Sequence, residues 1–187
     1  MSVVSLPFLI VKSHAYVGFW QPTSFIIYGL SLIILYAAST LYHSAKDPKR
    51  RRKLNIFDHA AIYVLIAGSY TPYCLVVLKG TLGWAVFGCT WVFALVGIIL
   101  KLFFTGRFDK LSTLMYLLMG WQVVFVINSL IENVPRHDLQ LLFLGGLFYT
   151  AGAVFYSLKR IPNNHAIFHG FVLLGSLCHF LSVYWFL

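Results

Sequence analysis

Charged residues are scarce in this chain of 187 residues. Only 10% of the residues are Asp, Glu, Lys or Arg, whereas 60% are hydrophobic and the mean hydropathy is +0.83. A soluble domain has about 25% charged and roughly 45–50% apolar residues. The polar residues here are too few to cover a soluble core of this size, and the same composition excludes disorder. The remaining class is an integral membrane protein.

Cysteine and acidic residues are also few. Three cysteines, an odd number set in apolar runs, argue against a disulfide-stapled secreted domain, and their spacing does not match metal-ligand pairs. Five Asp and Glu against 14 Lys and Arg give a net charge of +9. These cations fall between apolar segments, as in membrane proteins, and form no basic face. We therefore predict no nucleic-acid partner.

Long apolar runs indicate an all-α, polytopic transmembrane helix bundle. A membrane helix needs about 20 apolar residues, with a range of about 17–25. Within one membrane domain over residues 1–187, the predicted spans are 25–42, 59–78, 84–104, 111–131, 139–158 and 166–187. The apolar run 3–11 is too short to cross alone, so it is either the tail of a first helix or a segment in the interface. We expect no cleavable signal peptide, because no basic segment precedes this run.

The Lys and Arg residues are distributed unequally between the two sides of the predicted bundle. By alternation, one side receives Lys12, Lys79 and Arg136. The other side receives Lys46, Lys49, Arg50, Arg51, Arg52, Lys53, Lys101, Arg107, Lys110, Lys159 and Arg160. The positive-inside rule predicts that the richer side is cytoplasmic and that the C-terminus lies outside. Recognition of lipid headgroups is the alternative explanation for the cluster at 46–53.

Ionisable residues gather at the predicted cytoplasmic ends of three spans. His43 ends the first full span, Asp58 and His59 begin the second, and His165 and His169 begin the last. Ionisable side chains inside a membrane are costly and mark functional sites by default. Since three separate helices bring them to one depth, we predict a polar site just inside this interface.

The spacing of these residues favours a metal ion. Ser39 and His43, and likewise His165 and His169, are four residues apart, so each pair shares one helix face. Three histidines with an open fourth position match catalytic zinc, and Asp58 and Ser39 then orient the water at the metal.

Other readings of these histidines stay open. A His-x-x-x-His pair also arises by chance, and Ala166 stands where the zinc-protease motif requires Glu. At its predicted helix end, His59 is interpreted as a histidine that snorkels or caps. His179, about 15 Å beyond His169 along the helix, fits a hydrogen bond inside the bundle. Pro72 predicts a kink, with Ser69 or Thr71 satisfying the freed backbone groups.

Three motifs together resemble the hemolysin III family, the bacterial branch of the progestin and adipoQ receptor superfamily that includes the adiponectin receptors. They are Ser39–His43 (STLYH), Phe57–Pro72 (FDHAAIYVLIAGSYTP) and His165–His169 (HAIFH). The resemblance runs from about Phe25 to the C-terminus. It implies a seven-helix bundle with zinc near the cytoplasmic side, held by His43, His165 and His169, with Asp58 and Ser39 at the water. The family's polar motif in the first helix has no match before Phe25, so we expect that helix to be truncated or atypical.

The resemblance further implies a ceramidase-like zinc hydrolase of lipid amide bonds in the bacterial plasma membrane. The alternatives are a non-enzymatic sensor or regulator of the membrane with structural zinc, and a cytolytic pore. A pore requires polar stripes through the bundle, whereas these spans are apolar beyond the cytoplasmic third.

Overall fold

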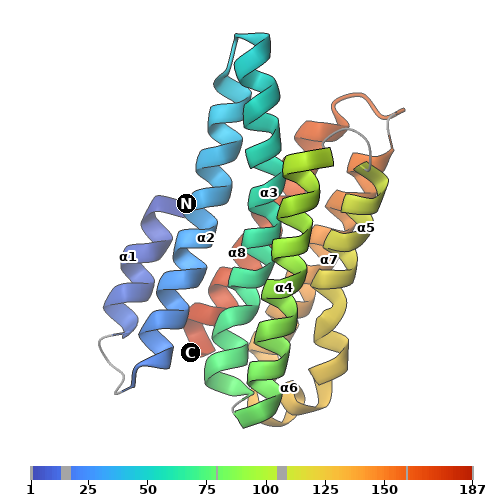
Figure 1. Cartoon of the computed structure of the whole chain (residues 1–187). Coiled ribbons are helices and arrows are strands. Elements are labelled where there is room, and N and C mark those ends of the chain that lie inside the picture. Colours follow the sequence, from blue (N-terminus) through green and yellow to red (C-terminus); the bar gives the residue numbers. More distant parts are fainter. Residues whose placement is uncertain (1, 14–17, 79, 105–108, 159, 187) are drawn as a thin grey trace. The chain divides into compact units, whose positions relative to one another are not determined.

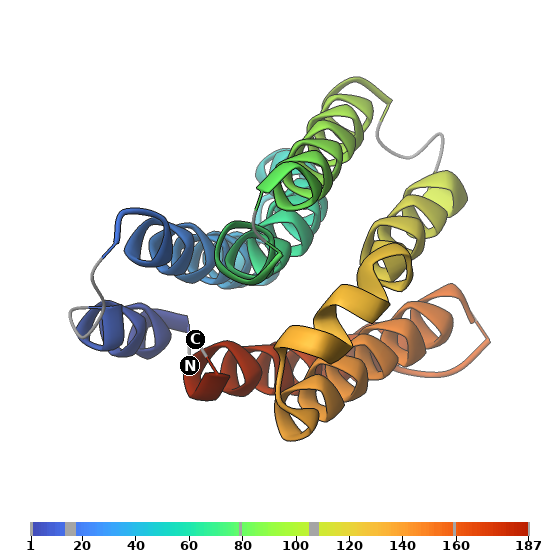
Figure 2. The same ribbon diagram turned by 90° about the horizontal axis from the view of Figure 1, so that it is seen from below.

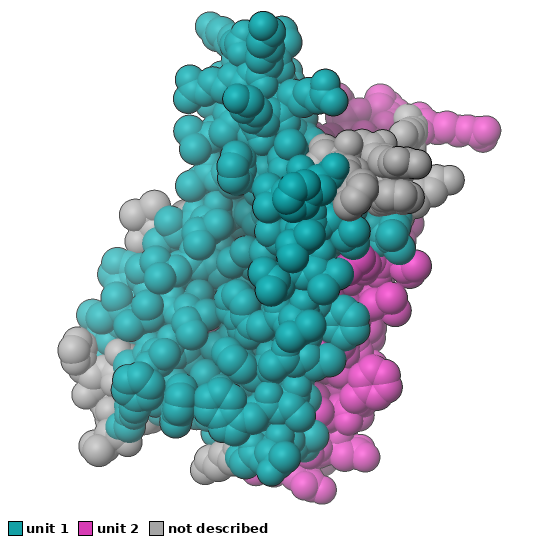
Figure 3. All heavy atoms as spheres, viewed as in Figure 1, with its two compact units in different colours: residues 1–112 teal, residues 113–187 magenta. Residues whose placement is uncertain are grey.

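The computed structural model describes residues 2–13, 18–78, 80–104, 109–158 and 160–186. Three cations of the charge distribution above, Lys79, Arg107 and Lys159, lie outside the described residues. The chain divides into two compact units, Met1–Ser112 and Thr113–Leu187, which Figure 3 distinguishes by colour. The described residues form helices and no strand, as the long apolar runs predicted.

The first unit is a row of helices in which each packs on the next along the chain (Figure 2). In order they are α1 (Ser2–Ser13), α2 (Trp20–Ser44), α3 (Pro48–Pro72), a π-helix η1 (Tyr73–Val77) and α4 (Gly80–Phe104). α5 (Asp109–Gly120) begins in this unit and continues into the second. The helices of this unit can be followed in Figure 1 from blue to green.

Glycines bring the helices of the first unit close together. A Cβ on Gly29 of α2 would lie 2.5 Å from the side chain of Leu6 in α1, and a Cβ on Gly68 of α3 would lie 2.6 Å from the Cβ of Ser31 in α2. A Cβ on Gly97 of α4 would overlap the ring of Tyr63 in α3. Without a hydrophobic effect inside lipid, such close van der Waals packing is a main source of helix association.

The second unit comprises the rest of α5, a 3₁₀ segment η2 (Trp121–Val126), α6 (Ile127–Asn133), α7 (Arg136–Ser157) and α8 (Asn164–Phe186). α7 and α8 form its main helix pair. The 3₁₀ segment lies within a predicted span, and the indole Nε1 of its first residue, Trp121, donates to the hydroxyl of Thr150 in α7 at 3.1 Å.

Polar groups join α7, between residues 138 and 149, to the second half of α8. The hydroxyl of Ser182 donates to the backbone oxygen of Asp138 at 2.8 Å, and Tyr149 Oη and Ser176 Oγ lie 2.8 Å apart. His179 Nε2 lies 3.1 Å from the backbone oxygen of Leu142. The prediction that His179 hydrogen-bonds inside the bundle is therefore confirmed.

The structure contains helices that agree with the predicted spans in number, length and composition. Among the described residues, six segments are long and apolar enough to cross a membrane: 20–44, 48–77, 80–103, 111–133, 136–157 and 164–185. The short run 3–11 is the helix α1 of 12 residues. The chain is a multi-pass helical membrane protein.

Two local features differ from the sequence-based expectations. The predicted spans 25–42 and 59–78 leave the residues between them as a connection, but α3 already begins at Pro48. The carboxylate of Asp47 caps this helix by accepting from the backbone N–H of Arg50 at 2.7 Å, and proline is favoured in a first turn.

The second difference concerns Pro72, whose ring clashes with the helix before it and removes a backbone donor. A proline at position 72 leaves the backbone oxygen of Gly68 without its usual helical donor. The hydroxyls of Thr71 and Ser69 do not replace that donor, because they donate to the backbone oxygens of Ala67 and Ile66, each at 2.8 Å. The ladder resumes with wider turns, because the N–H of Leu78 bonds to the oxygen of Tyr73 five residues earlier. The irregular backbone at Pro72 is thus a π-helix.

Candidate metal site

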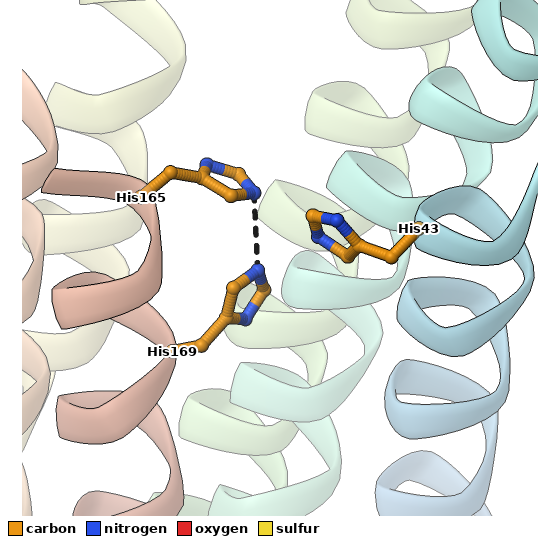
Figure 4. A group of neighbouring side chains, drawn as sticks. All are labelled: His43, His165 and His169. Carbon is orange, nitrogen blue, oxygen red and sulfur yellow. Dashed lines mark hydrogen bonds between the residues drawn. The ribbon is translucent and has the colours of Figure 1, made fainter. Parts of the chain in front are cut away.

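His165 and His169 project from the first turns of α8 and bring their ring nitrogens together. The two Nε2 atoms lie 3.1 Å apart, and the rings meet edge to face with centroids 4.7 Å apart. Both side chains are half-buried. Figure 4 draws the predicted ligand histidines, and its dashed line marks this contact.

This nitrogen pair fits the donor set of a zinc ion. Histidine nitrogens bind zinc at about 2.0–2.1 Å. Two such ligands of a tetrahedral ion lie about 3.3–3.4 Å apart, close to the Nε2–Nε2 distance of 3.1 Å in α8. Residues four apart on a helix face each other, so the sequence spacing explains the geometry.

Residues around the pair fix the start of α8. Asn164 Nδ2 donates to the backbone oxygen of Tyr156 at the end of α7 at 3.2 Å. The ring centroid of Tyr156 lies 5.8 Å from that of His165 and 5.1 Å from that of Phe168. The sequence reasoning did not single out Asn164 or Tyr156. An Asn at a predicted helix start was the available signal.

The other predicted site residues lie in the first unit, on α2 and α3. His43 is exposed in the last turn of α2, and Ser39 is half-buried one turn earlier. Asp58 lies on α3 with 5% of its surface exposed. His59 Nδ1 lies 2.8 Å from the backbone oxygen of Asn55, four residues earlier in the same helix. Because α3 already begins at Pro48, His59 does not lie at a helix end as its position had predicted.

The register between α2 and α3 shows the depth of these residues. Gly68 meets Ser31 where the two antiparallel helices touch. From this contact, Asp58 lies ten residues, or about 15 Å, toward the α2–α3 connection. On α2, Ser39 and His43 lie about 12 Å and about 18 Å in the same direction. Asp58 is therefore level with the turn that joins Ser39 to His43.

Helix geometry also places these residues on one side of the α2–α3 pair. Successive residues rotate by about 100° around an α-helix. We measure the rotation about each helix axis from the direction of the Gly68–Ser31 contact. Asp58 on α3 and Ser39 on α2 are each rotated by about 80° toward the same side of the helix pair, and His43 is rotated by about 120° toward that side. The first unit thus presents an imidazole, a carboxylate and a hydroxyl on one side and at one depth.

The sequence profile of the family described as Haemolysin-III related matches residues 1–180. The chain belongs to this family. The match covers the described part of every helix except the last turns of α8, and it confirms the resemblance that the three motifs carried.

Two bacterial relatives are similar over almost the whole chain. The Hemolysin-3 homolog of Bacillus subtilis (strain 168) is 46% identical over 183 residues, which are 98% of this chain and 86% of the relative. Hemolysin-3 of Bacillus cereus is 44% identical, over 98% of this chain and 84% of the relative. No solved structure matches the chain significantly.

A more distant relative is the human monocyte to macrophage differentiation factor. It is 29% identical over 171 residues, which are 88% of this chain and 71% of that protein. The similarity therefore extends from bacteria to animals over most of the membrane-spanning region.

Proposed function

We propose that this member of the Haemolysin-III related family is a zinc-dependent membrane hydrolase that cleaves amide bonds of lipids, with ceramide as the model substrate. The observation that carries the proposal is the pair of Nε2 atoms 3.1 Å apart on α8. In this proposal His43 is the third zinc ligand, and the ion lies near the cytoplasmic face. The fourth position stays open, as in catalytic zinc sites.

The polar residues of α2 and α3 support a reaction at this site in addition to metal binding. Zinc, when bound, would act as a Lewis acid and make hydroxide available from water near neutral pH. A buried carboxylate at the depth of His43 suits a general base, so Asp58 takes the proton of the attacking water at a carboxylate oxygen and passes it to the amine that leaves. Ser39 Oγ hydrogen-bonds to that water and orients it.

The substrate reaches the site from the membrane in this proposal. A lipid amide has acyl chains that remain in the bilayer, while its polar headgroup lies at the interface. The three histidines lie in the last turn of α2 and the first turns of α8, at the ends of spanning segments. Lateral entry therefore brings the amide to the zinc without moving the acyl chains into water.

The zinc content of the detergent-purified protein tests the metal site. We expect about one zinc ion per chain in the wild type and a large loss in His169→Ala and in His43→Ala, because each removes one of three protein ligands. His137→Ala is the matched control, since His137 is a 63% exposed histidine at the start of α7. Zinc content equal in all four proteins contradicts the site.

Hydrolysis of ceramide in mixed micelles tests the reaction. We expect Asp58→Asn to keep its zinc and to lose about 10²–10⁴-fold in kcat, the usual contribution of a general base. Unchanged hydrolysis in His169→Ala contradicts the enzyme. Bound zinc without any lipid amide hydrolysis favours the membrane regulator, and conductance in a planar bilayer that survives loss of all three histidines favours the pore.

A further inference from the structure

The basic cluster at residues 46–53 consists of Lys46 and residues 49–53, and it lies at the end of the α2–α3 hairpin where the two helices are connected. The structure places its last five cations in the first two turns of α3. All six side chains are exposed. The positive-inside rule explains why these residues lie on one side of the membrane, but it is satisfied equally well by cations in a loop. The Asp47 cap and Pro48 explain where α3 begins, but neither they nor the positive-inside rule explains why five cations share its first two turns.

The electrostatics of this placement are unfavourable for the isolated protein. The first turn of α3 contains no acidic residue, and cations are disfavoured there by the partial positive charge of a helix N-terminus. Lys49 and Lys53 are four residues apart on one face, a like-charge repulsion. Asp47 is the one acidic residue of the segment, and its carboxylate caps the helix. Within the described part of the chain, no carboxylate forms a salt bridge with the cluster.

Apolar side chains beside the cluster point to a lipid partner. Phe57 of α3 and Leu41 of α2 are 58% and 48% exposed, about one turn below the last cation. The guanidinium of Arg51 lies 5.4 Å from the ring centroid of Tyr42. This contact holds the side chain of Arg51 against the last turn of α2. The hairpin end thus presents cations next to exposed apolar groups, which complements a phosphate headgroup attached to an acyl chain.

We propose that the basic cluster at residues 46–53 binds the anionic headgroups of membrane phospholipids in the leaflet at this end of the hairpin. The phosphates offset the repulsion between neighbouring cations, while Phe57 and Leu41 contact the upper acyl chains. Clusters of four to eight Lys and Arg directly beside a membrane span are typical of such binding. The inference is independent of the zinc site.

Lipid titration of the purified full-length protein in an uncharged detergent tests this proposal. The probes are short-chain phosphatidylglycerol, short-chain phosphatidylcholine and inorganic phosphate. The wild type is expected to bind phosphatidylglycerol at least about tenfold more tightly than phosphatidylcholine, with an affinity that falls as salt rises. The double variant Arg52→Gln, Lys53→Gln is expected to lose about 10–30-fold of that affinity, since each cation near an anionic surface contributes a severalfold factor.

Two further variants control for charge and folding. Lys159→Gln with Arg160→Gln removes the same charge from the same predicted side, and we expect less than about a twofold change. Arg52→Lys with Lys53→Arg keeps the charge and is expected to keep the affinity. Equal binding of the two lipids by the wild type, or an equal loss in the Lys159 and Arg160 variant, overturns the proposal. Inorganic phosphate that competes at the same concentration as the lipid assigns the cluster to free phosphate and also overturns it.

Discussion

Gly97 is the residue at which α4 approaches the fully buried ring of Tyr63 in α3. A Cβ at this position would overlap the ring carbons, and a buried aromatic ring has little room to move. Overpacking of this kind costs about 1–3 kcal/mol. We therefore expect Gly97→Ala to lower the thermal unfolding temperature in detergent by several degrees.

Gly88 is the matched control for this substitution, because it lies in the same helix and a Cβ there meets nothing within 4 Å. Alanine is favoured over glycine inside a helix by about 0.5–1 kcal/mol. Gly88→Ala should thus leave the unfolding temperature unchanged or raise it. Equal effects of the two substitutions are inconsistent with close packing of α3 and α4 at Gly97.

At the scale of elements, α7 and α8 are interlocked by two rings that each lie over a glycine of the other helix. His179 of α8 covers Gly145, and Tyr149 of α7 covers Gly175, where a Cβ would lie 2.9 Å from the tyrosine ring. The hydrogen bonds of both rings add to this contact. The pair fixes the rotation of α8 and so the direction in which His165 and His169 point.

A double-mutant cycle tests this interlock. Gly145→Ala alone introduces a clash with the imidazole of His179, whereas in a His179→Ala background the added methyl group fills part of the space that the ring leaves. We expect the two substitutions to be non-additive by about 1 kcal/mol or more in unfolding free energy. Gly146→Ala, where a Cβ meets nothing within 4 Å, should be additive with His179→Ala. Additive effects at Gly145 contradict the interlock.

The elements also show where sequence reasoning succeeds and where it fails. Apolar length located the six spans because burial in lipid dominates their free energy. It missed the two turns of α3 before Asn55, because a hydropathy average treats charged helix and charged loop alike. The Asp47–Pro48 cap was the local signal for that start. The π-helix after Pro72 and the 3₁₀ segment at Trp121 depend on packing, which one sequence does not encode locally.

The candidate site shows the same division between local and long-range information. The four-residue spacing predicted that His165 and His169 share a face, and the Nε2 contact agrees. The positions at span ends predicted one depth for Asp58 and His43, whereas their placement on the same side of the α2–α3 pair required the close contact at Gly68. The ligation of zinc by these residues stays a prediction.

The unequal distribution of cations makes a prediction for the whole molecule. The basic cluster at 46–53 and the other cations of its side should hold that side in the cytoplasm, with the end of α8 outside. Alkaline phosphatase, which is active only outside the cytoplasm, should therefore be active when fused after α8 and inactive when fused after Arg160.

Reversing the charge of the cluster, with Lys49, Arg50, Arg52 and Lys53 all changed to Glu, should reduce the activity of the fusion after α8. The opposite pattern in the unaltered protein would place the predicted zinc site at the outer face, because His43 ends α2 and His165 and His169 begin α8, the helix ends that alternation of the predicted spans assigns to the basic side.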